Sequence, residues 1–366
     1  MHEWKKCKLV DAMTLQRGHD LPKSKMMNGS IPVAGSNGII GYHNKSTTDA
    51  PGITIGRSGN LGNAYYFKED FWAHNTTLYV KDFKGNNELF IYYFLKTFDF
   101  KQYNVGSAVP TLNRNHIHPL DVIIPPLPEQ KAIASVLFSL DEKIDLLHRQ
   151  NKTLEAMAET LFRQWFVEEA QDDWETAKIG DFFKTNVSSI TKDTTLERIR
   201  YLDTGSLTEG RIDRFQKFEM SDAPSRARRI VKHNDVLIST VRPNQKHYGI
   251  IKHPDEDIIV STGFCVITCE NINPHFIYIF LTTEEMTNYL HSIAEGSTSA
   301  YPSLKPSDIE NLEFKLPPEE KLKAFSEYAD NAWNKIEYNH RQIRTLEKLR
   351  DTLLPKLMNG EVRVQR

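Results

Sequence analysis

Two long stretches of the chain place apolar residues at alternating steps of three and four. The first stretch carries Ile133, Leu137, Leu140, Ile144, Leu147, Asn151, Leu154, Ala158, Leu161 and Trp165. The second carries Phe325, Ala329, Ala332, Ile336, Asn339, Ile343, Leu346, Arg350 and Leu353. A heptad series without an internal glycine or proline predicts long helices that pair as a coiled coil. Prolines at 125, 126 and 128 and at 317 and 318 precede the two stretches, where a helix start tolerates them.

Shorter runs of β-branched and apolar residues, separated by turn signals, fill the rest of the chain. Strands are predicted at Ile53–Ile55, Thr77–Val80, Asp121–Ile124, Val236–Ser239 and Phe264–Ile267, and short helices at Glu88–Thr97 and Pro274–Leu290. The turn signals are Asn28-Gly29, Asn37-Gly38, Ser58-Gly59-Asn60 and Glu209-Gly210. The pattern predicts an α+β fold in which two β-rich globular parts are separated by two long helices.

An internal repeat explains this alternation. A shift of 192 residues places Pro110 on Pro302 and Leu112 on Leu304, and it continues without a gap to Leu161 and Leu353. A weaker echo relates Trp4 and Lys8 to Trp174 and Lys178, whereas the intervening segments have little in common. The chain therefore reads as a pseudo-two-fold duplication of a variable globular part and a helix. We place the boundaries at 1–127, 128–170, 171–317 and 318–366.

Two seam asparagines predict the register of the helix pair. In an antiparallel pair, the register that brings Asn151 and Asn339 together joins residues whose numbers sum to 490. This register pairs Leu147 with Ile343, Ile144 with Leu346, Leu154 with Ile336, and Leu140 with Arg350. We predict that the two amides meet, because an unpaired buried amide is costly. Where Leu140 faces Arg350, we expect the arginine side chain to extend out of the seam so that its charge reaches solvent.

Bulk composition narrows the class of protein. The 366 residues are 39% hydrophobic and 26% charged, with neither a secretory signal at the start nor 18 consecutive apolar residues. The three cysteines form no disulfide framework, so we expect a cytoplasmic protein with reduced thiols. The net charge of −2 conceals a basic segment, 224–253, and an acidic helical segment, 141–173. This separation favours a DNA reader on a solvated spacer.

Motifs for catalysis are missing, whereas residues suited to DNA are clustered. We find no amino-methyltransferase motif, phosphate loop or zinc-binding cysteine pairs, and expect neither catalytic residues, metal nor cofactor in this chain. Arginine, asparagine and glutamine make bidentate contacts with base edges. The candidate DNA-binding residues are Arg57, Ser58, Asn60 and Asn63 in the first half and Arg242, Asn244, Gln245, Lys246 and Tyr248 in the second, with Arg226, Arg228 and Arg229 expected on phosphates. For each single residue, an ordinary exposed polar role is the alternative.

Four segments resemble those of type I restriction-modification specificity subunits. They are Leu127-Pro128-Glu129-Gln130 at the first helix start, Leu154–Val167, Leu353–Val362, and Gly56–Gly62 preceded by Gly-Ser-Asn-Gly at 35–38. The resemblance extends over the whole chain, with one departure at the second helix start, where Pro318-Glu319-Glu320-Lys321 does not keep the motif.

The resemblance implies a non-catalytic subunit that binds double-stranded DNA. Each globular part would be a target recognition domain that reads one half of an asymmetric bipartite site. The antiparallel helices would set the half-site distance and dock two methyltransferase subunits, which use S-adenosylmethionine, and further restriction or motor subunits, which use ATP. The alternatives are a self-contained DNA methyltransferase or nuclease, and a coiled-coil architectural DNA-binding protein.

Two loops are retained in the repeat although their surroundings vary, and we name them the first retained loop, Gly106–Arg114, and the second retained loop, Gly296–Leu304. Sequence reading should differ between halves, so retention indicates a structural hinge or a methyltransferase contact. Phosphate binding is the alternative, through Ser107, Thr111, Ser297 and Ser303.

Overall fold

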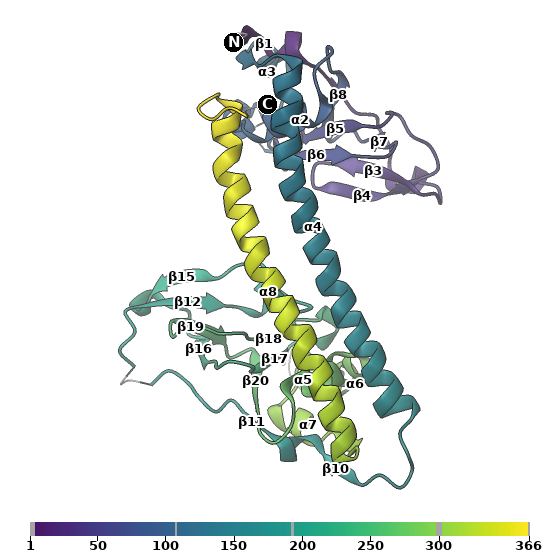
Figure 1. Ribbon diagram of the computed structural model, residues 1–366, viewed down its shortest axis with the longest axis vertical. Helices are drawn as coiled ribbons and strands as arrows, with labels where there is room; N and C mark the ends of the chain where they lie inside the picture. The colour runs from purple at the N-terminus through teal and green to yellow at the C-terminus, as the bar shows by residue number, and fades with distance from the viewer. Residues whose placement is uncertain (1–3, 107, 192–193, 298–301, 365–366) are drawn as a thin grey trace. The chain divides into compact units, whose positions relative to one another are not determined.

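The computed structural model describes residues 4–106, 108–191, 194–297 and 302–364 (Figure 1). The chain divides into two compact units: unit 1 comprises residues 1–147 and 342–366, and unit 2 comprises residues 148–341. The long helices α4 (Leu127–Arg163) and α8 (Glu319–Met358) begin within one residue of the boundaries expected from sequence. They are not bodies of their own, however, because the division cuts both helices and assigns each half to a globular part.

Unit 1 contains two sheets and a two-stranded ribbon. The main sheet has the antiparallel order β2-β8-β5-β6, with bounds Thr14–Arg17, Thr77–Asp82, Gly52–Gly56 and Ala64–Phe67. The second sheet has the order β4-β3-β7, with bounds Gly38–His43, Ile31–Gly35 and Trp72–Ala73. The ribbon pairs β1 (Lys5–Lys8) with β9 (Asp121–Ile124). The short helices are α1 (Leu9–Ala12), α2 (Glu88–Lys96), α3 (Arg114–Ile117), η1 (Lys23–Lys25) and η2 (Phe100–Tyr103).

Unit 2 repeats this plan with a larger second sheet. Its main sheet has the order β11-β20-β17-β18, with bounds Phe183–Thr185, Phe264–Cys269, Val236–Ser239 and Tyr248–Ile250. The second sheet has the order β15-β12-β19-β16, with bounds Gln216–Glu219, Arg198–Leu202, Ile258–Ser261 and Ala227–Ile230. Two ribbons pair β10 (Thr176–Lys178) with β21 (Glu313–Lys315) and β13 (Leu207–Thr208) with β14 (Arg211–Ile212). The short helices are α5 (Pro274–Thr282), α6 (Glu284–Glu295), α7 (Pro306–Glu310), η4 (Ile179–Phe182), η5 (Thr204–Ser206), η6 (Met220–Asp222) and η7 (Pro243–Gln245).

The helix predicted at Pro274–Leu290 is two helices. Thr283 takes an extended conformation and ends α5, and its hydroxyl accepts a hydrogen bond from the backbone N–H of Met286. A threonine in this position is a good helix cap, so the side chain stabilises a new helix start rather than a continuous helix.

The two globular parts share a strand register that their sequences do not reveal. Gly56 at the end of β5 pairs with Thr77, and Ser239 at the end of β17 pairs with Phe264. Each second sheet also contains one parallel pair, β3 with β7 and β12 with β19. The weak sequence similarity at the start of each half corresponds to equivalent strands. Lys8 pairs with Asp121 in the β1–β9 ribbon, and Lys178 pairs with Glu313 in the β10–β21 ribbon. Both units therefore have one common frame.

Each unit buries its core against halves of both long helices. In unit 1, the main sheet and α2 pack on the start of α4 and on Leu357 and Met358 at the end of α8. In unit 2, α5 and α6 pack on the end of α4 and the start of α8. The residues expected in the seam, Leu161 and Trp165, are partly buried against the unit 2 core, whereas the adjacent Phe162 and Phe166 are the buried ones. An α-helix drifts relative to a heptad repeat, and residues 164–168 form a wider π-helical turn.

The paired helices have the predicted antiparallel register in each unit. In unit 1, Ile144, Leu147 and Ile343 form a buried cluster on which Leu346 packs. In unit 2, Nδ2 of Asn339 donates to Oδ1 of Asn151 over 2.8 Å. None of the described helices is long and apolar enough to cross a membrane.

Candidate nucleic-acid interface

The β5–β6 loop (Arg57–Asn63) is a tight turn built on glycines. Gly56 N donates to Asn63 O over 3.1 Å, and Gly62 N donates to Gly56 O over 2.9 Å, so the loop closes on itself. Gly59 and Gly62 have positive φ angles of 84° and 79°. A Cβ atom on Gly56 would lie 1.9 Å from the carbonyl oxygen of Asn60, which only glycine avoids. The turn leaves Asn60 and Asn63 exposed and Ser58 half-buried.

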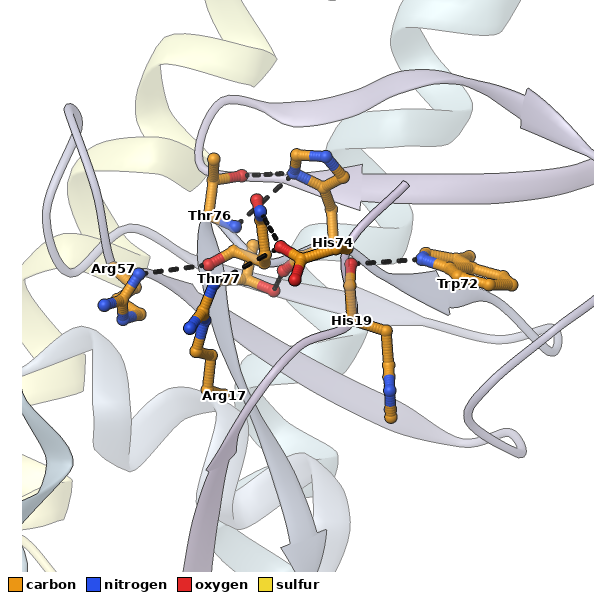
Figure 2. Close-up of polar contacts among 9 residues, drawn as sticks. Arg17, His19, Arg57, Trp72, His74, Thr76 and Thr77 are labelled. Carbon is orange, nitrogen blue, oxygen red and sulfur yellow. Dashed lines mark hydrogen bonds and ion pairs between the residues drawn. The ribbon is translucent and has the colours of Figure 1, made fainter. Parts of the chain in front are cut away.

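Arg57 is oriented by a neighbouring segment of the chain. Its Nη1 donates to the carbonyl oxygen of Asn75 over 3.2 Å (Figure 2). Its backbone N–H donates to Thr76 O over 2.8 Å. Burial lowers the pKa of the Arg57 guanidinium, the charge of Arg17 lowers it further, and Asp20 opposes both. A guanidinium held beside a second arginine gains from an approaching anion, as a DNA phosphate or base acceptor supplies.

Arg17, Asp20 and Asn75, three polar residues that sequence reasoning missed, lie beside Arg57. Arg17 at the end of β2 forms an ion pair with Asp20 at 3.3 Å, and the side chain of Asn75 donates to the same carboxylate (Figure 2). His74 turns toward Thr76, with 2.9 Å between Nδ1 and Oγ1. These residues flank β2 and β8, which pair in the main sheet, so their meeting depends on sheet order rather than on any local motif.

The β17–β18 loop (Thr240–His247) reaches a similar exposed turn by different means. Arg242 and Lys246 take left-handed backbone conformations, with φ of 49° and 56°, on either side of η7. Pro243 is buried, whereas Asn244 and Gln245 are exposed on the same short turn. Left-handed backbone is unfavourable for a residue with a side chain and persists only where the surroundings impose it.

The structure favours a structural role for two of the predicted residues. Nζ of Lys246 lies 2.6 Å from a carboxylate oxygen of Glu284 and 3.7 Å from one of Glu209, and these contacts raise the pKa of Lys246. Tyr248 packs edge-on against Tyr278 in the core of unit 2, and burial raises the pKa of its phenol. Contact of Lys246 or Tyr248 with DNA stays a prediction.

The arginine run (Arg226, Arg228 and Arg229) lies at the start of β16, an edge strand of the second sheet of unit 2, with Arg226 directly before the strand. Arg226 and Arg228 are exposed, and Nε of Arg228 donates to Ser225 O over 3.2 Å. Arg229 is half-buried and donates from Nη1 to the hydroxyl of Ser189 over 3.1 Å. The carbonyl of Arg226 accepts from Thr262 N, next to Gly263, whose carbonyl accepts from Thr240 N. The arginine run and the β17–β18 loop therefore adjoin the same turn.

The helix seams differ in polarity between the units. In unit 2, the Asn151–Asn339 pair is followed by Leu154 and Ile336, which contribute to the same core. In unit 1, Arg350 does not turn to solvent at the layer of Leu140, because its Nη1 forms an ion pair with Asp141 at 2.8 Å. Asp141 also accepts from the phenol of Tyr93 on α2 over 2.6 Å. The arginine charge is thus balanced where it lies.

Among the described residues, no group of three or more histidine, cysteine or acidic side chains could hold a metal ion. The second retained loop and Ser107 fall partly outside the described residues, namely at 107 and 298–301. Thr111, Ser297 and Ser303 are described, and phosphate binding by these residues stays a prediction.

Comparison with known proteins connects this geometry to a family. A family model for the type I restriction modification DNA specificity domain matches residues 1–156 and 171–348. The MjaIX type I restriction enzyme specificity subunit of Methanocaldococcus jannaschii is 26% identical over 306 residues, which are 75% of this chain and 69% of that protein. The MjaVIII specificity subunit of the same organism is 22% identical over 342 residues, 84% of this chain and 77% of that protein.

A solved structure has the same fold. The crystal structure of the S subunit of a type I restriction-modification system from M. genitalium is similar with a TM-score of 0.62 and 17% identity, covering 97% of this chain and 96% of that one. The family model matches well over half of the chain, in both halves of the repeat. The chain therefore belongs to the family of type I restriction-modification specificity subunits.

Proposed function

We propose that this chain is the DNA-reading subunit of a type I restriction-modification complex and that each unit reads one half of an asymmetric bipartite site. One observation carries the proposal: the two units share one strand register, yet the loops that follow β5 and β17 differ in sequence and in backbone conformation. A common frame with different exposed loops suits two readers of different base sequences.

We assign base reading to exposed side chains of these loops and phosphate contact to the arginine run. Arg242, Asn244 and Gln245 would address base edges of one half-site, and Arg57, Ser58, Asn60 and Asn63 those of the other. Arg226 directly before the edge strand, and Arg228 and Arg229 on it, would contact phosphates, which position the protein without reading sequence. The helix pair would set the spacing between half-sites.

The partners follow from the same proposal. Two methyltransferase subunits would dock on surfaces that the repeat supplies twice, and restriction subunits would join them. S-adenosylmethionine and ATP would be bound by those partners, and this chain would carry no catalysis of its own. A self-contained methyltransferase is the competing function, and the purified chain incubated with labelled S-adenosylmethionine and DNA should transfer no label.

Mapping methylated adenines tests the proposal. The chain is co-expressed with its methyltransferase subunits, and the methylated sites of the host genome are read by single-molecule sequencing. We expect two half-sites of different sequence at a fixed spacing; a palindromic target with identical halves would contradict the proposal. Arg242→Ala should relax only the half-site read by unit 2, and Arg57→Ala only the other. Native mass measurement should give two methyltransferase subunits per chain.

A further inference from the structure

The first retained loop is hydrogen-bonded to the main chain of the β5–β6 loop. Leu112 N donates to Arg57 O over 2.8 Å, and Gly59 N donates to Pro110 O over 2.9 Å. Between these bonds, Ser58 and Thr111 form an isolated antiparallel bridge. On its other side, Arg57 N is held by Thr76 O over 2.8 Å. The β5–β6 loop is thus fixed between the retained loop and the residue before β8.

Unit 2 contains the same contacts at the equivalent positions of the repeat. Leu304 N donates to Thr240 O over 2.8 Å, and Arg242 N donates to Pro302 O over 3.1 Å. Val241 and Ser303 form the matching bridge, and Thr240 N is held by Gly263 O over 2.8 Å. The shift of 192 residues carries Pro110, Thr111 and Leu112 onto Pro302, Ser303 and Leu304.

At this junction between the retained loop and the base-reading loop, the repeat keeps the side chains on one side and varies those on the other. The retained partners are Pro110 and Leu112 in unit 1 and again proline and leucine in unit 2. The loop residues that these main-chain bonds fix are Arg-Ser-Gly at 57–59 in unit 1 but Thr-Val-Arg at 240–242 in unit 2. Because the bonds join main-chain atoms, the held segment can change every side chain and keep its position.

We propose that the retained loop is a positioning element that clips the base-reading loop of each unit to the common frame. The proposal rests on the function proposed above and explains why the repeat retains this loop while the base-reading loops differ between the units. A reading loop fixed by main-chain bonds presents its side chains in one geometry, which discrimination between bases requires.

Asn104 is the positioning residue that makes this testable in unit 1. Its Oδ1 accepts from Gly106 N over 2.9 Å and from Thr111 N over 2.8 Å, and its Nδ2 donates to Gly106 O over 3.2 Å. These bonds shape the retained loop without touching the β5–β6 loop. In unit 2, the equivalent N–H of Ser303 donates to Ala294 O over 3.2 Å, near the end of α6, and to the hydroxyl of Ser297 over 3.4 Å.

The test compares Asn104→Ala with Asn113→Ala in the full complex with methyltransferase subunits. Asn113 lies at the end of the same loop, where its Oδ1 accepts from Asn115 N over 3.0 Å and caps α3, and among the described residues it does not bond the 104–111 turn that Asn104 shapes, so its replacement is a matched loss of one asparagine. The probes are duplexes carrying the mapped target, the target with the first half-site scrambled, and the target with the second half-site scrambled. Thermal unfolding is measured for each variant.

We expect Asn104→Ala to lower discrimination against the scrambled first half-site by about tenfold and to leave discrimination at the second unchanged. Asn113→Ala should change neither ratio, even where its melting temperature falls as much. Equal weakening on all three duplexes would mark the loop as a phosphate contact, and loss of methyltransferase binding would mark it as a docking surface; either overturns the proposal. Absence of any bipartite target in the wild type would instead refute the proposed function.

Discussion

The β5–β6 loop and the β17–β18 loop occupy equivalent positions but obtain their conformation in opposite ways. The first uses glycines, including Gly56, where no side chain fits, and Gly59 and Gly62 at positive φ. The second has Arg242 and Lys246 in left-handed conformations, with Pro243 buried between them. The β5–β6 loop turns at glycines, which adopt these backbone conformations without strain, whereas the β17–β18 loop turns at residues with side chains, which are strained there. The frame therefore accepts loops of unlike chemistry, provided that the main-chain bonds at the junction remain.

We expect the largest effect from Gly56→Ser. This substitution gives unit 1 the residue that unit 2 has at the equivalent end of its strand, Ser239. The new Cβ would meet the Asn60 carbonyl oxygen, and we expect displacement of the loop to cost roughly 3 kcal/mol, or about 100-fold in affinity for the first half-site. Binding to duplexes with either half-site scrambled measures this. Ser239→Gly is the matched control and should cost far less, and an unaffected first half-site in Gly56→Ser would refute the loop geometry.

Next in size is the asparagine layer, which distinguishes the unit 2 seam from that of unit 1. Asn151→Leu leaves the buried amide of Asn339 without its partner and should lower the free energy of unfolding by roughly 1–3 kcal/mol. The double variant with Asn339→Leu should melt above the wild type but methylate sites of mixed half-site spacing. A double-mutant cycle by thermal unfolding gives the coupling, and additive effects would show that the pair contributes no register specificity.

A smaller effect is expected for Arg226→Ala, directly before the edge strand β16, and for Arg228→Ala on that strand. Each should weaken binding to all sequences alike and reduce the slope of log affinity against log salt by about 1, because one phosphate contact is lost. Titrations at several salt concentrations measure the slope. A change confined to the base preference of one half-site would instead make these arginines readers.

The smallest effect should be the pH dependence of Glu155 on α4. Burial first, and then the charge of Glu209, raise the pKa of Glu155 to about 7. Because the pKa of Glu155 is higher in the folded protein than in the unfolded chain, the folded protein is favoured while Glu155 is protonated at low pH. That contribution to the free energy of unfolding is lost as the pH rises through 7. Glu155→Gln should therefore stabilise the protein at pH 8 more than at pH 5 in thermal unfolding. Glu347→Gln, at the equivalent repeat position, is the control, and an equal gain at both pH values would contradict the shift.

Sequence reasoning succeeded where the signal is local or repeated. The heptad spacing fixes which residues share one helix face, and the need of two seam asparagines to meet selects one register, in which Asn339 bonds Asn151 and Leu147 packs with Ile343, as the structure has it. The strands at Asp121–Ile124 and Val236–Ser239 were likewise predictable, because short β-branched runs between turns have few alternatives.

The candidate site was less predictable because it depends on strand order. Arg17, Arg57 and Asn75 come from separate segments that meet only because β8 lies between β2 and β5. The ion pairs of Lys246 with Glu209 and Glu284 likewise join three distant segments. Net charge over a segment could not reveal these pairings, so Lys246 looked more available to DNA than its contacts indicate.

The division of the chain into units has a consequence for biosynthesis. Unit 2 is one continuous segment, 148–341, whereas unit 1 needs residues 342–366 as well as residues 1–147. Leu357 and Met358 are buried in the unit 1 core. Nε of Arg363 lies 3.4 Å from Oε1 of Glu129, and the guanidinium of Arg363 lies over the ring of Trp4. On the ribosome, the half that is synthesised first is therefore completed last, reversing the usual order in which domains fold during translation. A chain that stops after Arg341 would leave the N-terminal half, and not the second, without part of its core.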